Sequence, residues 1–183
     1  MAETALVVVD MLNPYDHEDA ELLAASVEEM VGPGRELVER ACARGVDVIY
    51  VNDNYEDWNS SQDALVRQAL AGRRPDLVEP LLPPEGSSFV LKARHSVFYG
   101  TPLEHLLHER GLGRVALCGQ VTEQCILYSA LDAHVRHFRV AIPTDAVAAI
   151  YDHLAEAALE MMERNLRAEL AGSAGLALGP GAG

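Results

Sequence analysis

Five short, continuous apolar runs constrain the fold of this chain more than any other feature. They occupy residues 5–10 (ALVVVD), 47–52 (DVIYVN), 88–92 (SFVLK), 114–119 (RVALCG) and 138–142 (FRVAI). A run that is apolar at consecutive positions is typical of a strand buried on both faces of a parallel sheet. Segments with helical spacing lie between them, at residues 20–44 (interrupted by Gly32-Pro33-Gly34), 61–70, 102–110, 122–135 and 152–170. The alternation predicts an α/β fold, a three-layer α/β/α sandwich with a five- to six-stranded parallel sheet.

Chain length and local composition predict the domain organisation. The 183 residues correspond to one domain, which we place at residues 1–170. Residues 171–183 are rich in glycine and alanine and are expected to form a flexible tail. Residues 72–87 carry four prolines and are expected to form a long irregular connection, which inside a compact domain is more often functional than idle.

Charge and hydropathy argue against several classes of partner. The 28 aspartates and glutamates outnumber the 14 lysines and arginines, and the net charge of −14 disfavours binding to a nucleic-acid backbone. No apolar run approaches the roughly 18 residues that a membrane span requires, and no basic region precedes the first strand. Three cysteines are too few for a disulfide framework and suit a reducing compartment. We therefore expect a cytoplasmic protein that binds neither nucleic acid nor membranes.

Residues able to do chemistry follow the predicted strands, at the sheet edge where parallel α/β folds bind ligands. In strand order they are Asp10, Asn52 and Asp53, Lys92, Cys125, and Thr144 and Asp145. A carboxylate, an ammonium and a thiol are thus expected at one edge. Together they suit covalent catalysis, in which the thiol attacks, the carboxylate takes its proton and the ammonium holds negative charge.

The candidate nucleophile, Cys125, lies in the turn between a predicted strand and a predicted helix. Thr122 is suited to cap that helix, which places the thiol in its first turn. Free backbone N–H groups and the positive end of the helix dipole lower a thiol pKa there, so we expect them to favour the thiolate.

Each of these residues also has an ordinary structural explanation. Aspartate is common at the end of a first strand, a lone lysine is usually solvated, and cysteine is among the most often buried residue types. The spacing alone therefore leaves a catalytic and a structural explanation open. Cys42 and Cys118 fall within a predicted helix and a predicted strand, and we interpret both as packing residues.

Three ordered motifs resemble those of the isochorismatase-like cysteine hydrolases, a superfamily that includes nicotinamidases, N-carbamoylsarcosine amidase, ureidoacrylate amidohydrolases and isochorismatase itself. ALVVVDMLNPY resembles the first-strand motif with Asp10, and FVLKARHSVFYGTPLEHLL the lysine motif with Lys92. LCGQVTEQCILYSALDAHVRHFRVAIPTDAV resembles the nucleophile motif with Cys125. The resemblance runs from about residue 5 to residue 167.

The resemblance implies roles for individual residues that their spacing in the sequence does not establish. Cys125 becomes the nucleophile, Asp10 the base and Lys92 the charge-stabilising group. It further implies a cis peptide bond between Gln120 and Val121, with the backbone N–H groups of Val121 and Cys125 forming an oxyanion hole.

The chain departs from the metal-binding branch of this superfamily. Nicotinamidases follow the second strand with an Asp-x-His metal motif, whereas this chain reads Asp53-Asn54-Tyr55. The imidazole ligand is missing, so we predict no metal and no cofactor.

Two further departures concern the first and the last strand. The usual glutamine after the catalytic aspartate is Leu12, and the usual acidic-aromatic pair is Pro14-Tyr15, which removes a polar group expected to face the substrate. The usual last strand falls in AELAGSAGLALGPGAG, which has few β-branched residues, so a sixth strand is expected to be missing or degraded.

The candidates for the substrate pocket are the residues near the predicted strand ends: Tyr15, Asn52, Tyr55, Trp58, Arg94, Phe98 and Thr122. Aromatic residues in such loops either roof a pocket or lie at the surface or in a subunit contact. Arg94 either binds a substrate carboxylate or forms an exposed salt bridge. His95 is the histidine closest to the lysine motif.

The leading hypothesis is therefore a hydrolase that cleaves a C–N bond of a small amide, ureido or carbamoyl compound through a thioester. One alternative is a vinyl-ether hydrolase of the isochorismatase type, which uses Asp10 without Cys125. The other is a non-catalytic binding subunit with the same fold. We expect a small-molecule substrate and a homo-oligomer, either a dimer or a tetramer.

Overall fold

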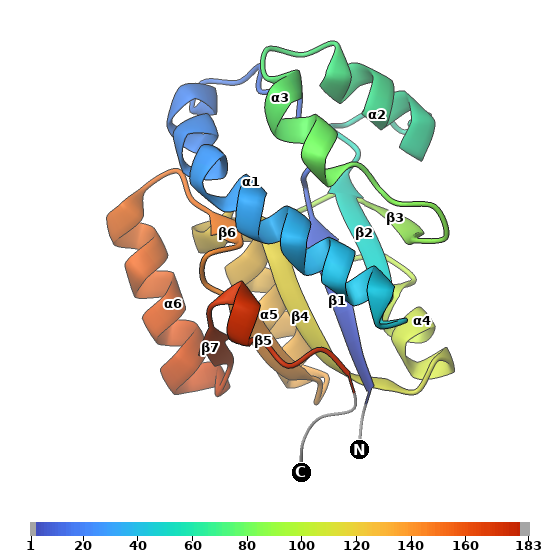
Figure 1. Cartoon of the computed structure of the whole chain (residues 1–183), viewed down its shortest axis with the longest axis vertical. Helices are drawn as coiled ribbons and strands as arrows, with labels where there is room; N and C mark the ends of the chain where they lie inside the picture. Colours follow the sequence, from blue (N-terminus) through green and yellow to red (C-terminus); the bar gives the residue numbers. More distant parts are fainter. Residues whose placement is uncertain (1–2, 180–183) are drawn as a thin grey trace.

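The computed structural model describes residues 3–179 and confirms the predicted α/β/α sandwich (Figure 1). The strands are β1 (Glu3–Val9), β2 (Asp47–Asp53), β3 (Ser88–Lys92), β4 (Leu112–Gln120), β5 (Arg139–Pro143), β6 (Val147–Ala148) and β7 (Glu169–Ala171). The helices are α1 (Ala20–Ala43), α2 (Gln62–Leu70), α3 (Pro75–Val78), α4 (Leu103–Glu109), α5 (Leu127–Val135) and α6 (Asp152–Leu166). Single turns lie at Glu79–Leu81, Thr122–Ile126 and Ser173–Gly175.

All strand pairs of the sheet are parallel, in the order β3-β2-β1-β4-β5-β7, and the two-residue strand β6 pairs with the end of β4. The five strands expected from the apolar runs all form, and β7 adds the sixth in this order. The strands β3, β2, β1 and β4 are consecutive neighbours, so their carboxyl ends lie side by side. The order therefore determines which sequence-distant residues can meet.

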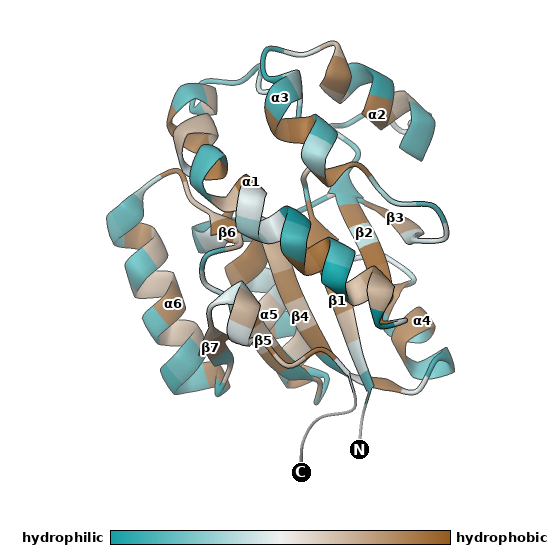
Figure 2. Cartoon of the chain, viewed as in Figure 1, coloured by the Kyte–Doolittle hydropathy of each residue, from teal (hydrophilic) through white to brown (hydrophobic). Residues whose placement is uncertain are grey.

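Both faces of the sheet are covered, which explains the continuous apolar runs. Alternate residues of β1 point to opposite faces: Leu6 and Val8 pack with residues of α1 and α3, and Val7 and Val9 with residues of α4, α5 and α6. Figure 2 shows the central strands as largely hydrophobic and the outer faces of the helices as largely hydrophilic.

Helix α1 continues through Gly32-Pro33-Gly34, where the sequence predicted an interruption. A proline inside a helix removes one backbone hydrogen bond and disfavours the helical path. Here the buried stripe of α1 stays in register on both sides of Pro33, and Gly34 lets the helix approach Leu81 closely. A Cβ atom at Gly34 would lie 3.6 Å from a methyl group of Leu81. Packing against the core therefore outweighs the local cost of the proline.

The segment 72–87 is more ordered than its prolines indicated. It contains α3 and the turn Glu79–Leu81, and its residues Leu77, Val78 and Leu81 are buried in the core beside α1. The expectation of a long irregular connection is wrong in this respect, because prolines at the start of each helical turn are compatible with a helix.

The predicted boundary between a domain at 1–170 and a tail from 171 falls inside β7. Helix α6 ends at Leu166, because Arg167 takes a left-handed conformation with φ of 55°, and the chain then returns to the sheet. Leu176 and Leu178 are buried in the core beside α1. Buried side chains thus hold the segment 171–179 against the core, although several of its small residues are exposed. The rest of the predicted tail, 180–183, lies outside the described residues.

Within the part of the chain that the structure describes, no helix combines the length and the apolar character needed to cross a membrane.

Candidate active site

Three groups from distant parts of the sequence meet at the carboxyl edge of the sheet. Lys92, at the end of β3, places its Nζ 2.9 Å from Oδ2 of Asp10, which follows β1. The same Nζ lies 3.7 Å from Sγ of Cys125, in the turn after β4. The Lys92 side chain is fully buried, and Asp10 and Cys125 are each more than nine-tenths buried. A thiol, a carboxylate and an ammonium therefore share one small, largely desolvated volume.

Asp53 supplies a second carboxylate, which the sequence pattern placed at this edge of the sheet without a role beside Lys92. Its Oδ2 lies 3.2 Å from Nζ of Lys92, and its backbone N–H donates to Oδ1 of Asp10 at 2.7 Å. Strands β2 and β3 pair so that Asp53 lies opposite Lys92. In the sequence, both residues stand at the ends of predicted strands. The contact could not be predicted from that position alone, because it also requires that the two strands be neighbours in the sheet.

A buried hydrogen-bond chain holds the backbone of Asp10. Asp10 has a left-handed conformation, with φ of 55°, which is costly for a residue with a Cβ atom and persists only where the surroundings enforce it. The side-chain amide of Gln120 donates to the Asp10 carbonyl, and the Tyr15 hydroxyl donates to Oε1 of Gln120 at 3.3 Å. Gln120 and Tyr15 thus orient Asp10 from inside the protein, a role that the sequence did not indicate for Gln120.

Strand β4, which leads into the turn that carries Cys125, has near its end a glycine that no other residue replaces easily. Gly119 has φ of 113°, and a Cβ atom there would lie 2.2 Å from the Val9 carbonyl oxygen. The bond between Gln120 and Val121 is cis, at the position that the family resemblance implies.

The turn itself, Thr122–Ile126, is π-helical rather than the start of a regular α-helix. The backbone N–H of Ile126 donates to the Val121 carbonyl five residues earlier, at 3.1 Å. Thr122 is not the helix cap that the sequence predicted: it is buried, and its hydroxyl donates to the Ala148 carbonyl at 3.0 Å. Its side chain thus ties the turn to β6.

The burial of these groups changes their pKa values. Desolvation raises the pKa of Asp10 above its usual value, although the Lys92 ammonium lowers it in part. Burial by itself would lower the pKa of Lys92, but the nearby carboxylates of Asp10 and Asp53 raise it. The lysine is therefore protonated at neutral pH.

The pKa of Cys125 is raised, whereas the sequence predicted a lowered value. Burial is the main cause and the nearby Asp10 charge adds to it. The Lys92 ammonium and the Val121 backbone N–H favour the thiolate, but they do not compensate. The resting group is thus a neutral thiol, and a base must take its proton before the sulfur can act as a strong nucleophile.

Two candidate pocket residues, Asn52 and Tyr55, hold the backbone of the loop that follows β1. The Asn52 amide accepts from the Leu12 N–H at 2.9 Å and donates to the Leu12 carbonyl at 3.3 Å. The Tyr55 hydroxyl donates to the same carbonyl at 3.1 Å. Leu12, which occupies the place of the family's glutamine, is fully buried in the core. The loop is therefore fixed by contacts to its backbone rather than by a polar side chain at position 12.

The remaining pocket candidates differ widely in exposure. Trp58 is 79% exposed, in the loop after β2. Arg94 is exposed and its Nη2 lies 3.8 Å from Oε1 of Glu56, as expected for a surface salt bridge. Phe98 is buried and packs against Phe138, with ring centroids 5.8 Å apart, so it belongs to the core between α4 and α5. Tyr15 is likewise buried.

The region after β2 does not fit a metal ion. Oδ1 of Asp53 accepts from the Tyr55 backbone N–H at 2.9 Å, and Oδ2 faces Lys92. Tyr55 stands where the metal-binding branch has its imidazole, and its hydroxyl is bonded to Leu12. Among residues 3–179 no group of three or more histidine, cysteine, aspartate or glutamate side chains is arranged to hold a metal.

The other cysteines and the nearest histidine lie outside this group. Cys118 is buried within β4 and burial raises the pKa of its thiol to about 12, and Cys42 is exposed on α1. His95 packs edge-on against the Tyr128 ring, with centroids 5.4 Å apart.

Comparison with known proteins shows the family to which this chain belongs. A family model described as isochorismatase domain matches residues 4–174. An isochorismatase family protein of Bacillus subtilis is 33% identical over 169 residues, which cover 92% of this chain and 93% of the relative. The ureidoacrylate amidohydrolase of Agrobacterium fabrum is 29% identical over 76% of this chain and 73% of its own length.

A solved structure has the same fold along nearly the whole chain. The N-carbamoylsarcosine amidase of Thermoplasma acidophilum superimposes with a TM-score of 0.73 at 30% identity. The match covers 95% of this chain and 98% of the amidase. The family resemblance carried by the three sequence motifs is thus confirmed over the whole domain.

Proposed function

Because this chain is a hydrolase of the isochorismatase family, we propose that it cleaves a C–N bond of a small amide, ureido or carbamoyl compound with Cys125 as nucleophile. The observation that carries the proposal is the position of one ammonium, Nζ of Lys92, 2.9 Å from the Asp10 carboxylate and 3.7 Å from the Cys125 sulfur. Few structural roles require a buried carboxylate, ammonium and thiol in mutual contact.

In the first step, Asp10 takes the thiol proton while the sulfur attacks the substrate carbonyl carbon. The raised pKa of the thiol means that this transfer accompanies the attack, and the raised pKa of Asp10 makes its carboxylate a stronger base than an exposed one. Lys92 stays protonated and offsets negative charge as the sulfur loses its proton. A hydrogen bond from the Asp53 N–H fixes the orientation of the Asp10 carboxylate.

The attack places negative charge on the carbonyl oxygen of the substrate. We assign its stabilisation to the backbone N–H groups of Val121, which directly precedes the turn Thr122–Ile126, and of Cys125, which lies within it. The Val121 N–H lowers the pKa of the Cys125 thiol in part, which supports this assignment.

Collapse of this intermediate breaks the C–N bond. Asp10 returns its proton to the leaving nitrogen, so ammonia or an amine departs and the acyl or carbamoyl group stays on Cys125 as a thioester or thiocarbamate. Water then attacks the same carbon, with Asp10 again taking a proton, and the acid product and the free thiol are released.

The experiment that tests the proposal is a screen for ammonia release over small amides, ureas and carbamoyl compounds. Cys125→Ala is expected to abolish turnover and to leave the fold intact, since alanine fits within the space of the thiol. A Cys125→Ala protein that keeps most of its activity, on vinyl ethers in particular, would instead favour Asp10-dependent vinyl-ether hydrolysis. No turnover of any compound by the wild-type protein, with ligand binding retained, would favour the non-catalytic subunit.

We also propose that the chain acts as a homo-oligomer in the cytoplasm. Exposed apolar side chains on neighbouring helices support the first part: Leu131 and Val135 on α5, and Met161 on α6. The three free cysteines support a reducing compartment. Sedimentation of the purified protein tests the oligomeric state.

A further inference from the structure

We propose that Glu123 is a positioning residue that holds the nucleophile turn in the geometry needed to stabilise the oxyanion. This inference rests on the proposed function and adds a residue to it. Glu123 lies between Val121 and Cys125, and it is nine-tenths buried although its side chain is ionisable.

The contacts of Glu123 join the nucleophile turn to the start of α6. Its Oε1 accepts two backbone N–H groups, those of Ile150 and Tyr151, each at 2.9 Å. Both donors lie just before α6, where backbone N–H groups have no partner within the helix. Oε2 is buried as well and has no hydrogen-bond partner among the described residues. A carboxylate is costly to bury, so its retention beside the nucleophile calls for a specific role.

The turn needs external support because of its local geometry. A π-helical turn closes its hydrogen bonds over five residues instead of four and is rare, and such turns are frequent at functional sites. Two side chains of this turn contact the segment 147–151. The Thr122 hydroxyl donates to the Ala148 carbonyl, and the Glu123 carboxylate accepts from the N–H groups of Ile150 and Tyr151. Glu123 makes two of these three bonds, so it contributes most to fixing the turn.

Loss of the Glu123 contacts is expected to affect catalysis through the positions of the Val121 and Cys125 N–H groups, and not only through the thiol. Val121 directly precedes this turn and Cys125 lies within it, so a shift of the turn moves the two donors relative to each other. A misplacement of about 1 Å in a catalytic constellation lowers the rate by about 10²-fold. Removal of the Glu123 contacts is therefore expected to impair acyl transfer, which needs the oxyanion donors. Alkylation of the thiol, which forms no oxyanion, is expected to change little.

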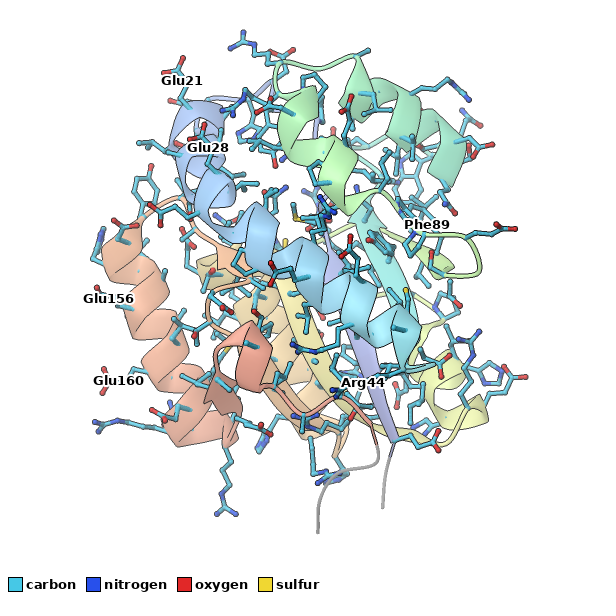
Figure 3. The ribbon with its side chains drawn as sticks, in the orientation of Figure 1. Glu21, Glu28, Arg44, Phe89, Glu156 and Glu160 are labelled. Carbon is cyan, nitrogen blue, oxygen red and sulfur yellow. The ribbon has the colours of Figure 1, made fainter. Side chains whose placement is uncertain are left out.

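The test compares these two reactions at the same sulfur atom. Acylation is followed with p-nitrophenyl acetate, which transfers its acetyl group to Cys125 and releases p-nitrophenol, and alkylation with iodoacetamide. The variants are Glu123→Ala, which removes the acceptor, Glu123→Asp, which shortens it by one methylene, and Glu123→Gln, whose amide oxygen can accept the same two N–H groups. Glu156→Ala is the matched control, because Glu156 points from α6 into solvent (Figure 3).

We expect Glu123→Ala and Glu123→Asp to slow acylation by about 10²-fold and alkylation less than threefold, while Glu123→Gln and Glu156→Ala stay within threefold of wild type in both. Thermal unfolding checks that each variant is folded. Equal losses in both reactions, equal losses in Glu123→Ala and Glu123→Gln, or unchanged acylation in Glu123→Ala would each overturn the inference. Failure of wild-type Cys125 to become acetylated, judged by peptide mass and by comparison with Cys125→Ala, would instead overturn the proposed function, and this inference with it.

Discussion

Nζ of Lys92 lies 2.9 Å from the carboxylate of Asp10, although their strands, β3 and β1, are separated in the sheet by β2. The contact forms because the lysine side chain crosses the end of β2, where it also meets Asp53. One cation is therefore shared by two carboxylates and a thiol. This arrangement determines the expected behaviour of each group.

Replacement of Asp10 by asparagine tests the role of Asp10 as base independently of the reactivity of the Cys125 thiol. Asp10→Asn keeps the side-chain shape but removes the proton acceptor, so turnover is expected to fall by about 10²–10⁴-fold. The negative charge of Asp10 raises the pKa of Cys125, so its loss lowers that pKa and more thiolate forms at a given pH. Iodoacetamide should therefore alkylate Cys125 faster in this variant than in wild type. Slower alkylation together with lost turnover would indicate a distorted site rather than a missing base.

The pH profile of kcat/KM follows from the direction of the pKa shifts. Asp10 must be ionised to act as base, and because its pKa is raised, the acidic limb of the profile should have its midpoint above the usual carboxyl value of 3.8. The pKa values of Cys125 and Lys92 are also raised, so both keep their protons beyond the usual thiol value of 9.0. Activity should rise as Asp10 ionises and stay level to above pH 9.0. A profile that rises only with a midpoint near 9.0 would show that the free thiolate, not a thiol activated by Asp10, is the reacting form.

The charges of the site and of the residues that follow β2 and β3 predict a preference for uncharged substrates. Asp10, Asp53 and Glu56 contribute three carboxylates, against the two cations of Lys92 and Arg94, and each cation lies beside a carboxylate. Iodoacetamide is neutral and iodoacetate is an anion of similar size, so the ratio of their rates at Cys125 measures this preference. The ratio should favour iodoacetamide more strongly at Cys125 than at the exposed Cys42 of the same chain.

Two variants test the source of that preference. Glu56→Gln leaves Arg94 without its acidic partner and should shift the ratio at Cys125 toward iodoacetate, by a few-fold at low salt and less at high salt. Arg94→Gln should shift it the other way. Faster reaction of wild-type Cys125 with iodoacetate than with iodoacetamide would contradict the prediction and point to a carboxylate-bearing substrate.

Glycine at position 119 should be required for stability. In Gly119→Ala the new methyl group would lie 2.2 Å from the Val9 carbonyl oxygen, at a φ of 113° that alanine rarely adopts. The free energy of unfolding in urea is expected to fall by at least about 2 kcal/mol. Gly32→Ala is the matched control: apart from its chain neighbours and its own helix, nothing lies within 4 Å of the added methyl group. The helix preference of alanine and the restriction that Pro33 places on the residue before it act in opposite directions, so the free energy of unfolding should change by less than about 1 kcal/mol. Equal effects of the two substitutions would contradict this account of Gly119.

Turnover should survive exhaustive chelation. Both oxygens of Asp53 accept hydrogen bonds within the protein, and Tyr55 replaces the histidine of the metal-binding branch. The measurement is ammonia release before and after dialysis against a chelator. Loss of turnover that added Zn²⁺ or Fe²⁺ restores would reveal a metal site built from other residues.

The sequence indicated the strands, the sheet type and the three chemical groups, for reasons that are local. A strand buried on both faces must be apolar at consecutive positions, as in β1, and functional residues of parallel sheets follow the strands directly, as Asp10 and Lys92 do. Errors arose where a local rule competed with packing. Pro33 did not end α1, because the helix buries the same face on both sides of it, and Thr122 did not cap a helix, because its hydroxyl bonds Ala148.

The sequence is therefore sufficient for the set of elements and for the residue types at their ends. The order of the strands in the sheet sets which of those ends are neighbours, and hence that Asp53 shares the ammonium of Lys92 and that Gln120 orients Asp10. The fold also sets the direction of the pKa shift at Cys125. The local position of the thiol, beside backbone N–H groups, favours the thiolate, but burial and the charge of a residue from another strand raise its pKa. Desolvation and charge depend on distances through space, which no local stretch of sequence contains.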